Sequence, residues 1–152
     1  MKLNLENTYN ILDASWEEKN ISLKNILSKN DKTILFFYPR DNTPGCTVEN
    51  KDFSSLKEEF NKKWINLVWV SKDSIESHKK FVLKQELRND LISDTDLILH
   101  KELWAYGEKN NYWKIVMGVI RSSFLVNKSW EVLQEWRNIR AKWHASRLLG
   151  EL

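Results

Sequence analysis

The chain has few of the residues that cross-link small proteins or form their turns, with one cysteine, two prolines and four glycines among 152 residues. One cysteine excludes an internal disulfide, but a chain of this length can bury an apolar core as one domain of residues 1–152. No run of eighteen apolar residues occurs, and the first residues contain no apolar signal segment and no small-residue cleavage site. We therefore expect a cytoplasmic protein in a reducing compartment.

Neither sign of charge predominates. The 24 basic and 21 acidic residues are interspersed and leave a formal charge of +3, which predicts a solvated mixed surface and no nucleic-acid or membrane partner. His78, His100 and His144 lie far apart and lack metal-ligand spacing. We expect them to be surface or half-buried helix residues, and we predict no metal site.

Two short apolar runs, residues 34–38 and 65–70, predict central strands that are covered on both faces. Apolar residues between them recur roughly at helical spacing, the last three at i, i+3 and i+7: Val48, Phe53, Leu56 and Phe60. This pattern predicts a helix that begins near Thr43 or Pro44 and buries the stripe.

Further elements are predicted downstream. Ser74 can cap a helix that runs through Lys84, and residues 93–96 open a shorter helix toward Tyr106. Residues 116–126 and 131–136 predict an antiparallel pair, because only a hairpin-sized connection separates them. Apolar residues at i, i+3, i+4 and i+7 predict a final helix: Ala145, Leu148, Leu149 and Leu152. With a weaker hairpin in residues 3–23, the order predicts an α/β fold in which helices flank a mixed central sheet.

Cys46 lies where the first of these strands gives way to a helix, in residues 37–49, which read FYPRDNTPGCTVE. The first-turn N–H groups of a helix favour a thiolate over a thiol, so this position suits a reactive cysteine. A lone cysteine is also commonly a small buried hydrophobe, and composition alone does not separate the two.

The spacing Pro-x3-Thr-x2-Cys after an aromatic strand resembles the active-site signature of peroxiredoxins. The sequence of residues 37–49 is similar to their bacterioferritin-comigratory, or Q-type, branch. Further matches are VSKDS at 70–74, LISD at 91–94, YGEK at 106–109 and GVIRSSFLV at 118–126. The resemblance implies a thioredoxin-like fold. It also implies a thiol-dependent peroxidase that reduces hydrogen peroxide and organic hydroperoxides without a cofactor.

The resemblance assigns a role to each matching residue. Cys46 is the nucleophile, the Thr43 hydroxyl bonds the peroxide, Arg121 stabilises the thiolate and polarises the peroxide, Pro39 shields the sulfur, and Glu49 helps to hold the site. The backbone amide of Cys46 would be a further donor. Thr43 could instead be only a helix cap, Arg121 an ordinary strand-end charge and Glu49 an ion-pair residue.

Many Q-type members carry a resolving cysteine five residues after the peroxidatic one, and here that position is Lys51. A sulfenic acid on Cys46 must then be reduced by an external thiol such as thioredoxin, glutaredoxin or a small molecule. The alternatives are a peroxide sensor that signals through mixed disulfides, and an inactive relative. The Q-type resemblance favours a monomer, although surplus tryptophan could build an interface.

The chain contains eight tryptophans but only four glycines, although glycine is normally much the more common residue. Average glycine usage of about 7% would give about eleven glycines in a chain of this length. Relatives typically show glycine at all the tryptophan positions except Trp136: Trp16, Trp64, Trp69, Trp104, Trp113, Trp130 and Trp143. We hypothesise that the source organism reads these seven codons as glycine, as bacteria with a reassigned UGA codon do.

The competing interpretations are that the rings belong to the core or an interface, or that they stack on nucleic-acid bases. If the rings are present, several should be exposed or should perturb turns, because glycine supplies the backbone conformations that tight turns need.

Overall fold

A computed structural model describes residues 5–41, 43–87, 89–111, 113–129, 131–137 and 144–152. The elements, in chain order, are β1 (Thr8–Leu12), β2 (Glu18–Ser22), α1 (Leu23–Leu27), β3 (Lys32–Phe37), α2 (Pro44–Ser55), α3 (Lys57–Lys62), β4 (Ile65–Ser71), α4 (Ile75–Gln85), β5 (Asp90–Ser93), α5 (Ile98–Glu102), β6 (Tyr106–Asn111), β7 (Lys114–Val119), β8 (Ser122–Asn127), β9 (Val132–Trp136) and α6 (His144–Glu151). In this part of the chain no helix combines the length and apolar character needed to cross a bilayer.

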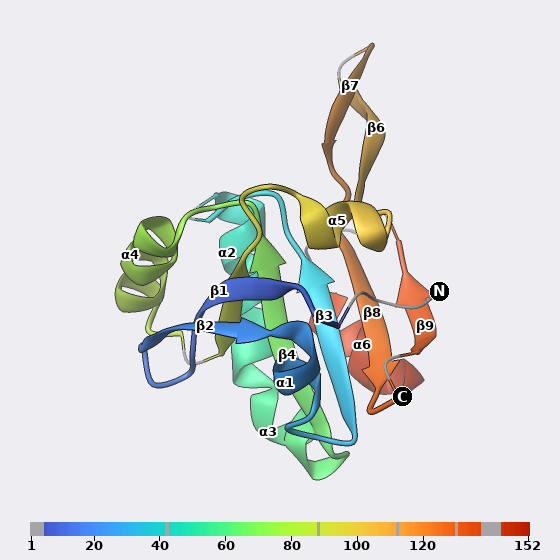
Figure 1. Ribbon diagram of the computed structural model, residues 1–152. Helices are drawn as coiled ribbons and strands as arrows, with labels where there is room; N and C mark the ends of the chain where they lie inside the picture. The colour runs from blue at the N-terminus through green and yellow to red at the C-terminus, as the bar shows by residue number, and fades with distance from the viewer. Residues whose placement is uncertain (1–4, 42, 88, 112, 130, 138–143) are drawn as a thin grey trace.

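The main sheet has seven strands in the order β2-β1-β5-β4-β3-β8-β9. The strand β4 pairs in parallel with β3 and β5, and the other neighbours are antiparallel, so the sheet is mixed. The predicted α/β fold is confirmed, including the N-terminal hairpin, which is β1 with β2. The two apolar runs form the central strands β3 and β4 (Figure 1).

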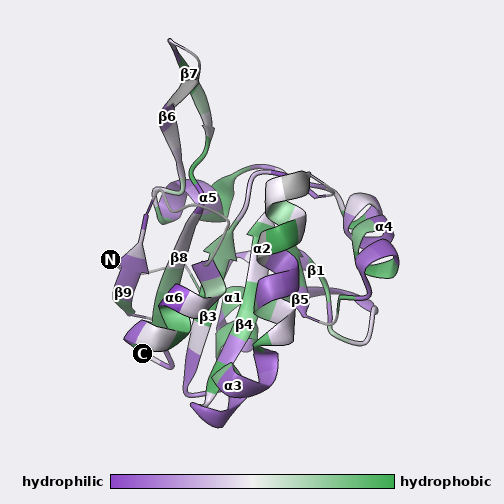
Figure 2. Cartoon of the chain, turned by 180° about the vertical axis from the view of Figure 1, so that it is seen from behind, coloured by the Kyte–Doolittle hydropathy of each residue, from purple (hydrophilic) through white to green (hydrophobic). Residues whose placement is uncertain are grey.

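Helices cover both faces of this sheet, and β3 divides its side chains between them. Ile34 and Phe36, with Tyr38 directly after the strand, pack in one cluster with residues of α2, α3, α4 and α6. Leu35 and Phe37 point to the opposite cluster, which contains residues of α1 and α5. Figure 2 views the first of these faces, where α4 alternates between hydrophilic and hydrophobic bands, as expected for a helix with one face on a sheet.

The helix after β3 begins as predicted, with Pro44 as its first residue and Thr43 at the N-cap position. It does not run straight to Phe60, because the chain breaks at Leu56 into α2 and α3. Phe53 and Phe60 are fully buried, whereas Val48 is 46% exposed. Val48 stands five residues before Phe53, and at 3.6 residues per turn this spacing places the Val48 side chain on a different face of the helix.

The prediction of one strand over residues 116–126 is wrong, because the structure divides it into β7 and β8. The strand β7 pairs with β6 in a separate two-stranded sheet that projects from the body of the molecule (Figure 1). The strand β8 joins the main sheet, and its predicted antiparallel pairing with the strand at residues 131–136, β9, is confirmed. The polar sequence of β6 gave no strand pattern, so the hairpin was not predicted.

The expectation that the histidines are surface or half-buried is also wrong, since all three are fully buried on helices. Each ring has a polar partner, which offsets the cost of burial. The pairs are His78 Nδ1 with Asp41 Oδ2 at 2.7 Å, His100 Nδ1 with Asp94 Oδ2 at 2.6 Å, and His144 Nε2 with Ser123 Oγ at 2.8 Å. The partners lie outside the helices that carry the histidines, so helical periodicity does not reveal them.

Left-handed backbone conformations concentrate at tryptophan. Among the described residues, positive φ occurs at six non-glycine positions and at no glycine: Trp16, Trp64, Glu86, Leu97, Trp104 and Trp113. A bulky side chain in this region is an outlier. Three of these rings are also exposed, Trp64 by 71%, Trp104 by 68% and Trp113 by 100%. Trp130 and Trp143 lie outside the described residues.

Candidate active site

Cys46 is the third residue of α2, at the end of the loop that leaves β3. The first helical hydrogen bond runs from the Thr47 N–H to the Thr43 carbonyl at 2.8 Å. The Cys46 N–H therefore belongs to the first turn, whose N–H groups have no acceptor within the helix and attract negative charge. The cysteine is 1% exposed.

Arg121 approaches this sulfur from the start of β8, the neighbour of β3 on the side opposite β4. It directly precedes β8, whose first residue, Ser122, pairs with Phe37 at the end of β3. The register thus brings a side chain 75 positions away to the strand end where the loop begins. Its Nη2 donates to the Cys46 Sγ at 3.4 Å. A permanently charged guanidinium at this distance favours a negative sulfur.

Thr43 is half-buried, and its hydroxyl donates to the Arg40 carbonyl at 3.0 Å. Although Thr43 is the N-cap residue, its side chain makes no capping hydrogen bond with the described first turn of α2. The hydroxyl oxygen therefore keeps its acceptor capacity for another partner. This geometry does not support a role limited to capping.

The remaining two predicted site residues are less fully described. Pro39 is half-buried and is the second residue after β3. Glu49 belongs to α2, but its side chain lies outside the described residues. The structure therefore brings together Cys46, Arg121 and the loop that carries Pro39 and Thr43.

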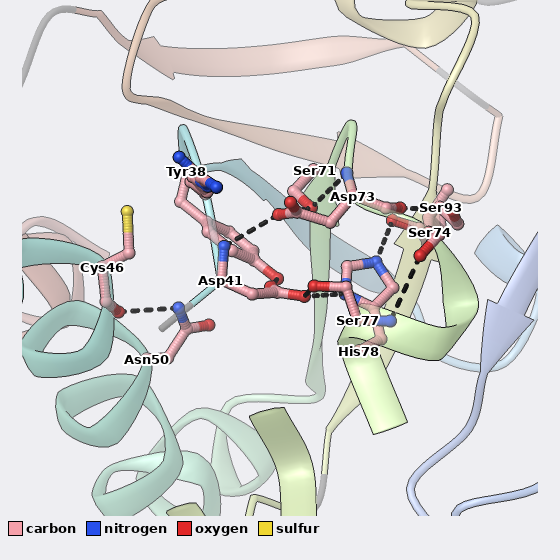
Figure 3. A network of polar contacts seen from close by, with 12 residues as sticks. Tyr38, Asp41, Cys46, Asn50, Ser71, Asp73, Ser74, Ser77, His78 and Ser93 are labelled. Carbon is pink, nitrogen blue, oxygen red and sulfur yellow. Dashed lines mark hydrogen bonds and ion pairs between the residues drawn. The ribbon is translucent and has the colours of Figure 1, made fainter. Parts of the chain in front are cut away.

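Asp41 lies at the middle of this loop and is held from three sides (Figure 3). Its carboxylate accepts from the Tyr38 hydroxyl at 2.6 Å, the Ser77 hydroxyl at 2.9 Å and the His78 ring at 2.7 Å. Burial and the adjoining Asp41 charge raise the pKa of Tyr38 well above its ordinary value, so the phenol stays protonated as a donor. The Asp41 N–H donates to Asp73 Oδ2 at 2.8 Å.

A second contact fixes the backbone of the cysteine itself. The buried amide of Asn50 donates to the Cys46 carbonyl at 2.7 Å, one helical turn away. This bond supports the first turns of α2 from within the core.

Sequence reasoning missed Asp41, His78 and Asn50. Asp41 and Asn50 lie within or beside the motif but carry no chemistry that the motif requires. A signal existed for His78, because Ile75, His78 and Val82 follow i, i+3 and i+7 and therefore share one face of α4. A histidine on an apolar stripe indicates a buried polar partner.

The arrangement suits nucleophilic chemistry at sulfur. A cation and a helix N-terminus favour the thiolate, and the first-turn N–H groups can stabilise negative charge that develops on a nearby oxygen. Within the described ranges, no group of three or more potential ligand residues could hold a metal ion.

Comparisons with known proteins agree with this geometry. The sequence model of the AhpC/TSA family matches residues 5–134. A putative peroxiredoxin bcp of Helicobacter pylori is 44% identical over 132 residues, 87% of this chain and 86% of that protein. Peroxiredoxin Bcp of Xanthomonas campestris is 41% identical over 119 residues, 78% of this chain and 74% of that protein.

Solved structures give the same picture. A cysteine variant of Xanthomonas campestris Peroxiredoxin Q superposes with a TM-score of 0.86 at 33% identity, over 97% of this chain and 89% of that chain. A second structure is that of the Xanthomonas campestris bacterioferritin comigratory protein, to which alkyl peroxide reduction activity is attributed. It superposes with a TM-score of 0.84 at 33% identity, over 97% of this chain and 90% of that chain.

Proposed function

The chain belongs to the AhpC/TSA family and is a thiol-dependent peroxidase of the Bcp, or Q-type, peroxiredoxins, and we propose that it works with Cys46 as its only redox residue. The observation that carries this proposal is the contact between the Arg121 guanidinium and the Cys46 sulfur. It joins two residues that the family signature assigns to catalysis.

The first step is attack of the Cys46 thiolate on one oxygen of the hydroperoxide. An S–O bond forms and the O–O bond breaks, so the other oxygen leaves with the electron pair and takes a proton, as water or an alcohol. Arg121 and the Cys46 N–H stabilise the charge that develops on the departing oxygen. The Thr43 hydroxyl orients the peroxide, Pro39 limits access to the sulfur, and Glu49 supports the site. The product on the protein is a sulfenic acid.

The second step needs an external thiol, because the sequence contains no other cysteine. One thiol displaces water from the sulfenic acid and forms a mixed disulfide, and a second thiol releases Cys46 as it forms the external disulfide. The position of the family's usual resolving cysteine is occupied by the exposed Lys51 on α2. Thioredoxin, glutaredoxin and small thiols all fit this chemistry.

We propose both hydrogen peroxide and organic hydroperoxides as substrates. The alkyl peroxide reduction attributed to the Xanthomonas campestris relative supports the organic class. We further propose a cytoplasmic monomer, in keeping with the reducing conditions that a one-cysteine cycle requires.

Substitution of Cys46 by serine tests the function directly. Cys46→Ser should abolish peroxide consumption and dimedone labelling, because no other side chain can form a sulfenic acid. Wild-type protein exposed to peroxide without thiol should carry one dimedone adduct. Peroxide consumption that survives in Cys46→Ser would contradict the mechanism.

A screen of reductants separates the peroxidase from the peroxide sensor. Sustained turnover with any external thiol supports the enzyme. Consumption of one equivalent of peroxide with every reductant, followed by a stable mixed disulfide, would indicate the sensor instead.

A further inference from the structure

A buried polar cluster connects the loop before Cys46 to α4 and β5 (Figure 3). The Asp41 side chain is 1% exposed and the His78 side chain 0%. Tyr38 and Ser77 donate to the same carboxylate, so Asp41 receives three hydrogen bonds from side chains. A buried carboxylate with this many donors has one strongly preferred position.

The His78 ring is fixed as firmly as its partner. Nδ1 faces Asp41 Oδ2 at 2.7 Å, and Nε2 faces the Ile92 carbonyl on β5 at 3.2 Å. Both ring nitrogens thus face oxygen atoms of other segments, which hold the ring in one orientation. The ring links the active-site loop to the central sheet.

Asp73 holds the loop from the strand end beside it. Its Oδ2 accepts from the Asp41 N–H and from the Ser71 hydroxyl, each at 2.8 Å. The Ser93 hydroxyl on β5 donates to the Asp73 carbonyl. The backbone and the side chain of Asp41 are therefore both anchored, while Pro39 and Thr43 lie two residues to either side of it.

We propose that His78 is a positioning residue for the peroxidase reaction and acts through Asp41. It fixes the loop that carries Pro39 and Thr43 against the first turn of α2, so that the Thr43 hydroxyl and the Cys46 sulfur meet the peroxide together. The proposal rests on the peroxidase function. Misplacement of reacting groups by as little as an ångström can lower a rate up to about a hundredfold, so a distant residue can control this step.

Two substitutions of His78 separate positioning from packing. His78→Asn keeps a donor close to the position of Nδ1 and so retains the bond to Asp41. His78→Gln keeps a donor close to Nε2 and so retains the bond to Ile92 but releases Asp41. Both remove the ring, so a purely structural role predicts similar losses of thermal stability and similar rates.

The measurement is the rate constant for Cys46 oxidation by hydrogen peroxide, with Cys46 alkylation by iodoacetamide as a second readout. In His78→Gln the oxidation rate should fall about tenfold without a matching loss of alkylation, because loop geometry and not sulfur reactivity has changed. His78→Asn should stay within about threefold of wild type on the same reasoning. Asp41→Asn, nearly isosteric, should reproduce the loss if His78→Gln folds poorly.

Equal oxidation rates in the two His78 variants, or parallel losses of oxidation and alkylation, would overturn the positioning role. If wild-type Cys46 is not oxidised by peroxide at all, the peroxidase function itself is wrong. The two failures are therefore distinguishable.

An independent observation concerns the tryptophans. Trp104 follows the C-cap of α5 with φ of 59°. Its N–H donates to the Lys101 carbonyl at 3.3 Å, and the Ala105 N–H donates to the His100 carbonyl at 2.8 Å. These two bonds form a complete Schellman motif, in which the residue at the position of Trp104 is usually glycine.

Three other tryptophans occupy turn positions that also favour glycine. Trp64 follows the C-cap of α3 with φ of 63°, and its N–H donates to the Asn61 carbonyl at 3.0 Å. Trp16, with φ of 65°, closes the β1–β2 turn by donating to the Asp13 carbonyl at 2.9 Å. Trp113, with φ of 73°, is the second residue of the turn between the paired Asn111 and Lys114. Each of these positions requires a left-handed backbone conformation, which glycine adopts most easily.

The fifth described member of the set, Trp69, differs in being fully buried in β4. Its indole Nε1 is buried without a hydrogen-bond partner, which is unusual because buried tryptophans normally find an acceptor. Trp136 differs from Trp69, since it is buried and its indole donates to the Glu151 carboxylate. The half-buried Trp16 also has an indole partner, the Leu87 carbonyl at 2.7 Å.

From these conformations we infer that the protein made in its source cell carries glycine at residues 16, 64, 69, 104, 113, 130 and 143, and tryptophan only at 136. The four turn positions carry the inference, because four unrelated turns each require the backbone freedom that glycine has. A single reassigned codon, UGA read as glycine and not as tryptophan, accounts for all seven positions, including the two outside the described residues.

Intact-mass measurement on protein purified from the source organism tests the inference. The expected mass lies below that of the printed sequence by seven times the difference between tryptophan and glycine residues. The gene should carry UGA at these seven codons and UGG at codon 136. A mass that matches eight tryptophans, or UGG codons at the four turn positions, would overturn the inference.

Discussion

At the scale of single residues, the site depends on where one charge lies relative to one sulfur. Cys46 is almost completely buried, an environment that by itself disfavours a thiolate. Arg121 and the first turn of α2 oppose this burial cost because both present positive electrostatic potential to the sulfur. The proposed reactivity of the cysteine therefore depends on its own helix and on Arg121, which comes from a distant segment.

Removal of the guanidinium should slow the first step. Arg121→Met keeps much of the apolar stem but leaves the developing negative charge without this donor, and the rate of Cys46 oxidation should fall about a hundredfold. Stopped-flow oxidation by hydrogen peroxide measures the effect. The exposed Arg40 offers a control, since Arg40→Met removes an equal charge from the loop and should change the rate little. Equal effects of the two substitutions would indicate that only overall charge matters.

The strained turns give a prediction about stability. Trp104→Gly should raise the free energy of unfolding by about 1 kcal/mol, because the Schellman position no longer holds a bulky residue in the left-handed region. Chemical denaturation measures the change. Trp136→Gly is the matched control and should lower stability by about 3 kcal/mol or more, because it removes a buried ring. A destabilised Trp104→Gly would mean that the exposed ring makes compensating contacts.

At the scale of secondary-structure elements, α5 depends on an acidic residue that precedes it. Asp94 Oδ1 accepts from the Ile98 N–H at 3.0 Å, and Oδ2 accepts from the backbone N–H and the ring of His100 at 2.9 and 2.6 Å. Burial of the Asp94 carboxyl opposes its ionisation, but the hydrogen bonds from His100 outweigh burial and lower its pKa below the ordinary value. The ionised carboxylate therefore stabilises the start of this short helix.

The sign of this shift predicts a dependence on pH. A carboxyl with a lowered pKa in the folded state stabilises the fold above its unfolded pKa of about 3.9, and the contribution disappears as pH falls through the folded pKa. Asp94→Asn should therefore lower stability by about 1 kcal/mol or more at neutral pH. The difference from wild type should narrow in strong acid. Asp96→Asn, at an exposed neighbouring position, is the control, and a pH-independent difference would contradict the assignment.

At the scale of the whole molecule, the β6–β7 hairpin stands apart from the sheet that carries the site (Figure 1). Its side chains Ile115 and Met117 are 73% and 59% exposed. Among its described side chains, those in the core lie at its base, the buried Val119 and the half-buried Tyr106. The hairpin therefore adds little to the stability of the domain.

Shortening this hairpin tests its independence. Replacement of residues 108–117 by Asn-Gly joins the paired Gly107 and Gly118 through a favourable two-residue turn. The thermal midpoint and the rate of Cys46 oxidation should change little, within about twofold for the rate, because exposed segments tolerate such changes. A much larger loss of rate would show that the hairpin orders Arg121, which follows it in the chain.

The sequence was sufficient for the local parts of the fold. The apolar runs of β3 and β4 and the cap at Ser74 are local patterns, and the structure contains these strands and the helix that Ser74 begins. The division of residues 116–126 was not predictable, because continuous apolar sequence does not show where a chain leaves one sheet for another. The partner of His78 was not predictable, because Asp41 lies 37 residues away.

By itself, the sequence determined the family of the chain and led to two proposals, Cys46 as the nucleophile and an external thiol as the reductant, because a motif and the number of cysteines are properties of the chain alone. Only the tertiary structure decided that Arg121 contacts the sulfur, that His78 and Asp41 anchor the loop, and that the described turn tryptophans occupy glycine conformations. These contacts and conformations depend on strand register and helix packing, which bring distant residues together and impose a backbone shape on each turn.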